Sequence, residues 1–106
     1  MITIEEFQKL DLRIGTIKEV KSHPNADKLY VLKVDLGNEE RQIIAGIKSH
    51  YKEKELLNKQ IVIIVNLQPV VLRGIESQGM LLAASDDKDL AVLTPDKDIS
   101  NNSKIK

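Results

Sequence analysis

The sequence predicts an all-β protein: a five-stranded Greek-key barrel with a short helix between strands 3 and 4 and a short N-terminal helix. The order of the expected elements predicts this fold, because three strands, a helix and two further strands follow one another. The length agrees, since 106 residues suffice for one small barrel. The apolar phase of the first strand also shifts next to Gly15, which indicates the bulge that lets a strand coil around a barrel. We expect residues 1–106 to form a single domain.

The N-terminal helix is predicted over about residues 4–9. Thr3 and Glu6 have the spacing of a capping box, and Ile4, Phe7 and Leu10 recur at helical spacing. A helix this short is not stable alone, so its apolar stripe must dock. It docks either on its own domain or on a second subunit.

The first three strands are expected at residues 12–20, 29–36 and 41–45. The second strand alternates, with Tyr30, Leu32, Val34 and Leu36 on one face, and the dipeptide Gly37-Asn38 turns it into the third strand. Turn-forming residues between the first two strands predict a loop there.

The second half of the chain predicts a helix and two strands. Ser49 is expected to cap a helix over residues 51–57, with Leu56 and Leu57 turned inward. Residues 60–67 are apolar on both faces, which predicts a central strand. Residues 70–79 are expected to be irregular. A fifth strand at 80–84, a turn at 86–89 and a partner at 90–93 precede a polar tail.

This order is that of the oligonucleotide/oligosaccharide-binding barrel, the OB-fold. β-grasp and SH3-like barrels fit some of the same strands, but neither so naturally places a helix between strands 3 and 4. In the OB-fold, ligand lies against strands 2 and 3, between the loops joining strands 1 to 2 and 4 to 5. Those loops are residues 23–28 and 68–79, and both have a polar composition that packing does not explain.

Composition excludes several classes of protein. Sixteen Lys and Arg balance sixteen Asp and Glu, which argues against a binder held to nucleic acid by bulk charge. No cysteine is present, and His23 and His50 lie far apart, so we expect no metal, no cofactor and no catalytic centre. No secretory signal is visible, and the apolar run at 61–65 is too short to cross a bilayer. We therefore expect a cytoplasmic protein with no membrane partner.

The polar residues favour RNA as the ligand. Six cations are expected on or beside the binding face, together with three acids, so the face is modestly positive: Arg13, Lys28, Lys33, Arg41, Lys48 and Arg73, with Asp27, Asp35 and Glu76. The aromatic residues are only Phe7, Tyr30 and Tyr51. Binders of single strands stack bases on several aromatic side chains. The scarcity of aromatic residues in this chain therefore favours a structured RNA that is recognised by its shape, 2′-hydroxyls and phosphates.

Several segments resemble the tRNA-binding domain that stand-alone tRNA-binding proteins share with methionyl-tRNA synthetases. They are residues 11–15 (DLRIG), 23–29 (HPNADKL), 41–43, 46–47, 66–67, 72–80 (LRGIESQGM) and 93–96. The resemblance implies a homodimer that grips the outer corner of tRNA and reads no anticodon. It also implies a partner, the catalytic subunit of a methionyl-tRNA synthetase, which the chain would assist in trans as a non-catalytic beta subunit.

The resemblance places seven residues in the tRNA site: Asn25, Lys28, Lys48, Arg73, Ser77, Gln78 and Met80. Lys28 would supply charge to a phosphate, Ser77 a small hydroxyl to a 2′-hydroxyl, and Met80 a pliable surface to an exposed base. Ser77 is alternatively a turn residue, and Met80 a core residue. Arg73 contacts a phosphate or forms an ion pair at the barrel rim. The segment His23-Pro24 is expected to fix the shape of its loop.

A second function remains open. A related branch of this fold comprises secretion-associated chaperones that bind extended peptides and have a similar length. That branch departs from the pattern at residues 76–80, which this chain retains. Peptide binding would favour a broad apolar groove, which sequence does not reveal.

Overall fold

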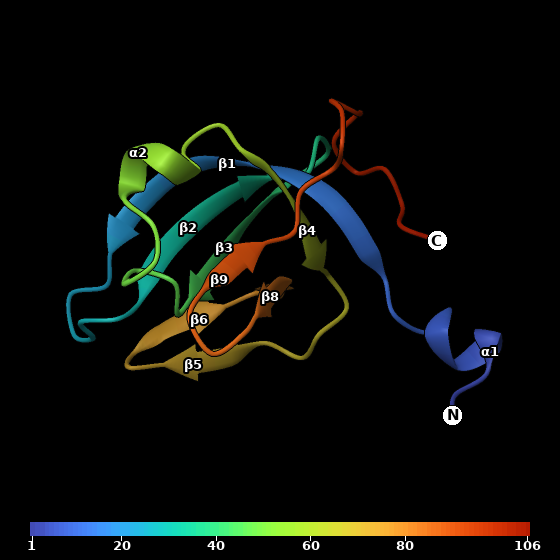
Figure 1. Cartoon of the computed structure of the whole chain (residues 1–106), viewed down its shortest axis with the longest axis horizontal. Coiled ribbons are helices and arrows are strands. Elements are labelled where there is room, and N and C mark those ends of the chain that lie inside the picture. Colours follow the sequence, from blue (N-terminus) through green and yellow to red (C-terminus); the bar gives the residue numbers. More distant parts are fainter.

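The computed structural model describes all residues from 1 to 106 and contains a five-stranded antiparallel sheet coiled into a nearly closed barrel (Figure 1). The strands are in the order β3-β2-β1-β4-β7. The elements are α1 (Ile4–Phe7), β1 (Leu12–Ser22), β2 (Tyr30–Asp35), β3 (Glu40–Ala45), α2 (Glu53–Leu56), β4 (Gln60–Ile64), β5 (Val70–Leu72), β6 (Ile75–Ser77), β7 (Met80–Leu81), β8 (Ala83–Ser85) and β9 (Leu90–Val92). The predicted fold class is confirmed.

Strand β1 is the long, bent strand at the centre of the sheet. Its first half pairs with β4 and its second half with β2. The predicted bulge is present, although it falls at Lys18, between the paired residues Ile17 and Glu19, and not beside Gly15. Gly15 has a packing role instead, because a Cβ there would lie 2.6 Å from Cγ1 of Val34. The glycine therefore lets β2 pack closely against β1.

The barrel core follows the predicted alternation of β2. Tyr30, Leu32, Val34 and Leu36 are all buried, together with apolar residues of the neighbouring strands. Helix α2 adds Leu56, which is fully buried, whereas Leu57 is 47% exposed. The prediction that both leucines turn inward is wrong for Leu57 because it is the C-cap, already extended in conformation. The helix also begins after Lys52, so Ser49 is not its cap.

The chain between β4 and β7 differs most from the prediction. β4 ends at Ile64, and residues 70–77, expected to be irregular, form the hairpin β5–β6. Its turn is Arg73-Gly74, with φ of 53° and 91°, and positive φ at both positions is what a two-residue type I′ turn requires. The predicted fifth strand is also divided, into β7 and β8, and β8 pairs with β9 across the expected turn at Asp86.

Both termini lie at one end of the barrel, on the right in Figure 1. The capping box of α1 is present, yet no residue of this helix is buried. The polar tail, for which no element was predicted, runs along the first half of β1 with backbone hydrogen bonds from Asn102 to Ile14 and from Ile105 to Leu12. Asn66 links the α1–β1 connection to β4 by accepting from the Asp11 N–H and donating to the Lys9 carbonyl. Neither helix has the length or composition to span a membrane.

Candidate nucleic-acid interface

The loop between β1 and β2, residues 23–29, is tied to the tip of the β5–β6 hairpin by one buried histidine. His23 is 4% exposed; its Nδ1 accepts from the backbone N–H of Asn25 (3.0 Å), and its Nε2 lies 2.9 Å from the carbonyl oxygen of Leu72. Since a backbone N–H can only donate and a carbonyl only accept, the proton of the neutral ring is on Nε2. The predicted role of His23 in fixing its loop has a geometric basis here, and the ring also reaches a second loop.

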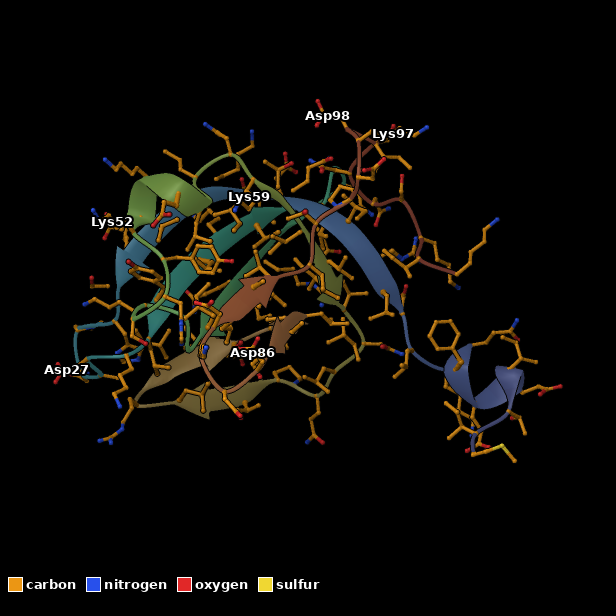
Figure 2. All side chains as sticks on the ribbon, in the orientation of Figure 1. Asp27, Lys52, Lys59, Asp86, Lys97 and Asp98 are labelled. Atoms are coloured by element: carbon orange, nitrogen blue, oxygen red, sulfur yellow. The ribbon has the colours of Figure 1, made fainter.

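A third loop, between β3 and α2, joins the same end of the molecule. The backbone N–H of Lys48 donates to the carbonyl of Lys28 (3.4 Å). Figure 1 shows the β1–β2 loop, α2 and the hairpin tip together on the left, away from both termini. In Figure 2 the labelled Asp27 and Lys52 lie at this end, whereas Lys97 and Asp98 lie above the barrel at the top of the view. We call the β1–β2 loop, the β3–α2 loop and the hairpin tip the loop end.

Three cations of the loop end form no ion pair. Of the six cations predicted near the binding face, three form ion pairs elsewhere: Arg13 with Asp11, Lys33 with Glu19, and Arg41 with Glu39. The other three, Lys28, Lys48 and Arg73, form none. Lys28 and Arg73 are exposed and Lys48 is half-buried. Asn25 is exposed beside them, so four of the seven predicted site residues gather here.

Ser77 and Gln78 do not lie in this cluster. They lie where the end of the hairpin is hydrogen-bonded to β3 and closes the barrel, a junction that we call the seam. The Ser77 hydroxyl accepts from the backbone N–H of Ile44 and donates to the Gly79 carbonyl, both at 2.9 Å. The Gln78 side chain accepts from the backbone N–H of Gln42 (3.0 Å), whose carbonyl accepts from the Gln78 N–H. Ser77 is 1% exposed, so direct contact with RNA is not supported by its position. Ser77 is the last residue of β6 and not the turn residue expected as its alternative, and its two bonds give it a structural role.

Two residues of β3 with a role at this seam were not predicted. Arg41 donates from Nη1 to the carbonyls of Val65 and Gln78, and Gln42 donates from Nε2 to that of Glu76. Together they hold the chain that leads into and out of the hairpin. Arg41 was expected as a cation of the binding face and both residues lie in the resembling segment 41–43, but this role was not foreseen, since their partners lie 24 to 37 residues away and are backbone oxygens.

Gly79 and Met80 complete the seam on the β4 side. Gly79 has a φ of +131°, and a Cβ there would lie 2.7 Å from the carbonyl oxygen of Ile64. Met80 is half-buried at the start of β7, where it pairs with Ile64. Its position is therefore intermediate between the two alternatives, core packing and an exposed surface for a base.

No tyrosine or phenylalanine ring is available at the loop end for stacking, and the exposed ring there is the imidazole of His50. Tyr30 is buried and donates to the Tyr51 carbonyl, and burial raises the pKa of its phenol. Tyr51 accepts from the Val92 N–H, and the Lys59 ammonium lies 5.2 Å from the centre of its ring. Phe7 belongs to α1 at the other end. No cluster of three or more His, Cys, Asp or Glu side chains could hold a metal ion.

The strand order, the seam and the cationic loops define a small barrel of the oligonucleotide/oligosaccharide-binding class. The chain belongs to the putative tRNA-binding domain family, whose model matches residues 12–104. It is 57% identical to the methionine–tRNA ligase of Pyrococcus horikoshii over 105 residues, which are 99% of this chain and 14% of that enzyme. The chain thus spans about one seventh of the curated relatives that it matches.

Two solved structures are similar over their whole length. A protein from Pyrococcus horikoshii described as related to methionyl-tRNA synthetase has a TM-score of 0.94 and 31% identity, covering 100% of this chain and 98% of its own. The CsaA chaperone protein of Picrophilus torridus has a TM-score of 0.92 and 36% identity, with full coverage of both chains. The chain is therefore similar to solved structures with two kinds of described role.

Proposed function

We propose that this chain binds tRNA at the loop end. The carrying observation is that three unpaired cations, Lys28, Lys48 and Arg73, come from three separate loops that hydrogen bonds hold together. Phosphate contacts of this kind position a protein on nucleic acid without reading its sequence. Asn25 and Met80 are proposed as further contacts. Ser77 and Gln78 support the site by holding the seam beside it.

Recognition by shape follows from what the loop end lacks. With no exposed Phe, Tyr or Trp ring at the loop end to stack on bases, affinity depends mainly on phosphates and 2′-hydroxyls held in a fixed arrangement by folded RNA. The outer corner of tRNA offers such an arrangement in every tRNA. We therefore propose binding that does not distinguish between tRNA species.

A competition experiment tests this function. Labelled, unfractionated tRNA is bound to the chain and displaced by unlabelled tRNA, duplex DNA of equal phosphate content, or an unfolded peptide, at several salt concentrations. We expect tRNA to compete best and affinity to fall with salt, because bound counterions are released. Equal displacement by duplex DNA, or better displacement by the peptide, contradicts the proposal.

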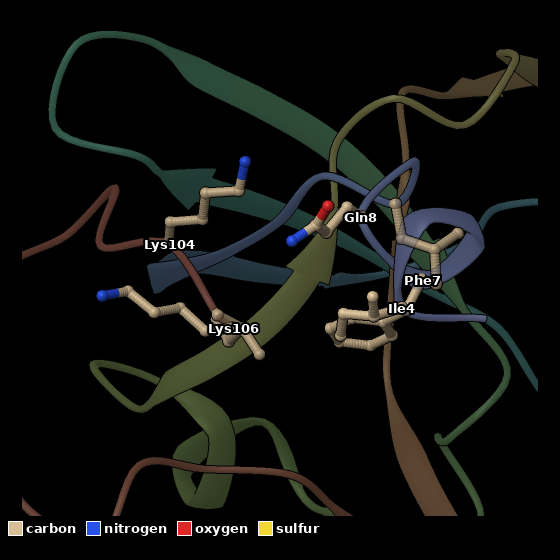
Figure 3. A pocket seen from close by; sticks show the side chains of 7 residues that line it. Ile4, Phe7, Gln8, Lys104 and Lys106 are labelled. Atoms are coloured by element: carbon tan, nitrogen blue, oxygen red, sulfur yellow. The ribbon is translucent and has the colours of Figure 1, made fainter.

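Self-association at the other end is part of the proposal. A groove of about 450 Å³ lies between α1 and the C-terminal segment, lined by Ile4, Phe7, Leu10 and Ile105 with the stems of Gln8, Lys104 and Lys106 (Figure 3). Met1 and Ile2, beside it, are fully exposed and 68% exposed. We propose that a second copy of the chain covers this apolar surface in a homodimer, the second of the two docking modes expected for the N-terminal helix.

Action in trans on a methionyl-tRNA synthetase is the remaining step. Relatives at 57% identity are methionine–tRNA ligases of which this chain matches a small part. We propose that the chain, in the cytoplasm, raises the affinity of a separate catalytic subunit for its tRNA. Adding it to that subunit is expected to lower the KM for tRNA and leave kcat unchanged, since it supplies binding and no chemistry. An unchanged KM contradicts the step.

Peptide binding is the second candidate function. The full-length similarity to the CsaA chaperone of Picrophilus torridus favours it, and the exposed apolar side chains of Leu67, Val70 and Val71 offer a surface. The same competition separates the two functions. A peptide that displaces tRNA at low and at high salt alike would favour a chaperone, because apolar contacts are not screened by salt.

A further inference from the structure

We infer that His23 is a positioning residue that holds the hairpin tip, residues 72–75, against the β1–β2 loop, so that Arg73 and Lys28 meet the same ligand. The inference rests on the proposed function, because it describes how the proposed tRNA site is kept in one arrangement. It concerns the relative placement of two loops and not a contact of His23 with RNA. The ring is 4% exposed and both of its nitrogens are already bonded within the chain.

The hairpin tip has little else to hold it. The base of the hairpin is fixed by bonds to β3 at Glu76 and Ser77. At the tip, the one side-chain hydrogen bond is that from His23 to the Leu72 carbonyl. Arg73 and Gly74 are exposed, and a Cβ placed on Gly74 would meet no atom within 4 Å, so the turn residues themselves are not packed against other residues. Leu72 and Ile75 are half-buried, so without His23 we expect the tip to keep this packing but to move more about its base.

The two bonds of the ring have separable functions. Nδ1 accepts from Asn25 within the same loop, whereas Nε2 reaches 49 residues along the chain to Leu72. An asparagine at position 23 offers an amide oxygen near Nδ1 but is too short to replace Nε2. A glutamine is longer, and its amide nitrogen can donate to the Leu72 carbonyl. His23→Asn therefore keeps the local bond and breaks the bond between loops, and His23→Gln tests rescue.

The first experiment needs no RNA. Backbone ¹⁵N relaxation of the free chain is measured for residues 70–77 in the wild type, His23→Asn and His23→Gln. We expect the tip amides to become mobile in His23→Asn and to recover at least in part in His23→Gln, while ring ¹⁵N shifts of the wild type report a protonated Nε2. His50→Asn is the matched control, because this exposed ring makes no hydrogen bond. Unchanged tip dynamics in His23→Asn overturn the inference.

The second experiment measures coupling to RNA. The slope of log affinity for unfractionated tRNA against log salt is determined for the wild type, His23→Asn, Arg73→Ala and the double variant. Arg73→Ala is expected to lower the slope by about 0.7–0.9 in the wild type and by less than half as much in the His23→Asn background. His23→Asn alone is expected to weaken binding by up to about tenfold.

The outcomes separate this inference from the proposed function. A merely structural role of His23 would lower stability and leave the effect of Arg73→Ala equal in both backgrounds, which overturns the inference. If the wild type does not bind tRNA and the tip is still released in His23→Asn, the proposed function fails and the positioning role of His23 stands. Loss of folding in His23→Asn is checked by thermal unfolding. In that case His23→Gln, which keeps the bond to Leu72, is expected to show the wild-type effect of Arg73→Ala and wild-type tip dynamics, and a reduced effect with a mobile tip overturns the inference.

Discussion

The two ends of the barrel differ in the kind of side chain that is left exposed. At the loop end, backbone and side-chain polar groups hydrogen-bond across three loops, and exposed charged side chains there, among them Lys28, Arg73 and Asp27, form no ion pair. At the terminal end, which comprises α1 and residues 102–106, the backbone of the tail is bonded to β1, yet apolar side chains remain exposed. Ile4 is 63% exposed and Leu10 is 41% exposed.

This difference teaches which kind of partner each end can accept. A loop end whose internal hydrogen bonds are already formed is organised before binding, so a charged ligand loses little conformational entropy by docking there. A helix with no buried residue gains stability only when its apolar face is covered. We therefore expect a polar, folded ligand at one end and a second apolar surface at the other, and changes at one end should leave the other intact.

The largest expected effect is at the terminal end. Ile4→Asp places a carboxylate in the apolar groove, in the first turn of α1, where an acidic residue suits the helix itself. In a two-fold dimer the change occurs twice, so we expect dimer affinity to fall by about a thousandfold, or about 4 kcal/mol. Sedimentation equilibrium measures the association.

The matched control is Leu57→Asp, which alters an exposed leucine outside the groove and should leave association unchanged. Affinity for tRNA per chain should survive in the Ile4→Asp monomer. If that monomer loses all salt-dependent binding of tRNA, the two ends are not independent. If Ile4→Asp still dimerises as tightly as the wild type, the groove is not the interface.

The second largest effect concerns the seam. Ser77→Ala leaves the buried N–H of Ile44 without its partner, so we expect the free energy of unfolding to fall by about 1–3 kcal/mol. Affinity of the folded variant for tRNA should change less than about twofold, because the hydroxyl is used inside the chain. Urea unfolding and a binding titration measure the two quantities, and Ser85→Ala, on the exposed strand β8, is the control. A tenfold weaker affinity at unchanged stability would instead identify Ser77 as an RNA contact.

The fold was predictable because each early strand carries its own pattern. The alternation from Tyr30 to Leu36 and the Gly37-Asn38 turn define the β2–β3 hairpin locally. The hairpin at 70–77 was missed because its strands have only three residues each, and a turn with Arg in the left-handed region is an unusual sequence for this purpose.

The site was predictable only at the level of loops. The resemblance placed Lys28 and Arg73 in the two ligand loops, and both are exposed there. The resemblance did not reveal that the Ser77 hydroxyl faces β3. That orientation depends on which strand edge residues 75–77 reach, and two turns separate these residues from β4. The bond from His23 to Leu72 is equally invisible in sequence, since it joins residues 49 positions apart through a backbone oxygen.

A smaller effect is expected from one charge at the loop end. Lys28→Ala removes one unpaired cation from the proposed phosphate contacts, and the slope of log affinity against log salt should fall by about 0.7–0.9. Lys97→Ala removes the same charge on another side of the barrel (Figure 2) and should leave the slope unchanged. If Lys97→Ala lowers the slope as much as Lys28→Ala does, the affinity for tRNA depends on the net charge of the chain and not on the cations of the loop end.

The smallest effect is the acid sensitivity of the terminal end. The Arg13 guanidinium donates to the carboxylate of Asp11 and holds its pKa below the ordinary value of 3.8. A lowered pKa in the folded state contributes stability above that value, and this contribution is lost as pH falls through the folded pKa. Asp11→Asn should therefore be less stable than the wild type at neutral pH, and the difference should shrink below pH 3.8.

Because Arg13 also donates to the Asn102 carbonyl, amide exchange of the tail should quicken in the variant, and Asp98→Asn controls for the loss of one negative charge. If the difference in stability stays constant down to low pH, the Asp11–Arg13 pair stabilises the fold by its packing and not by its charges.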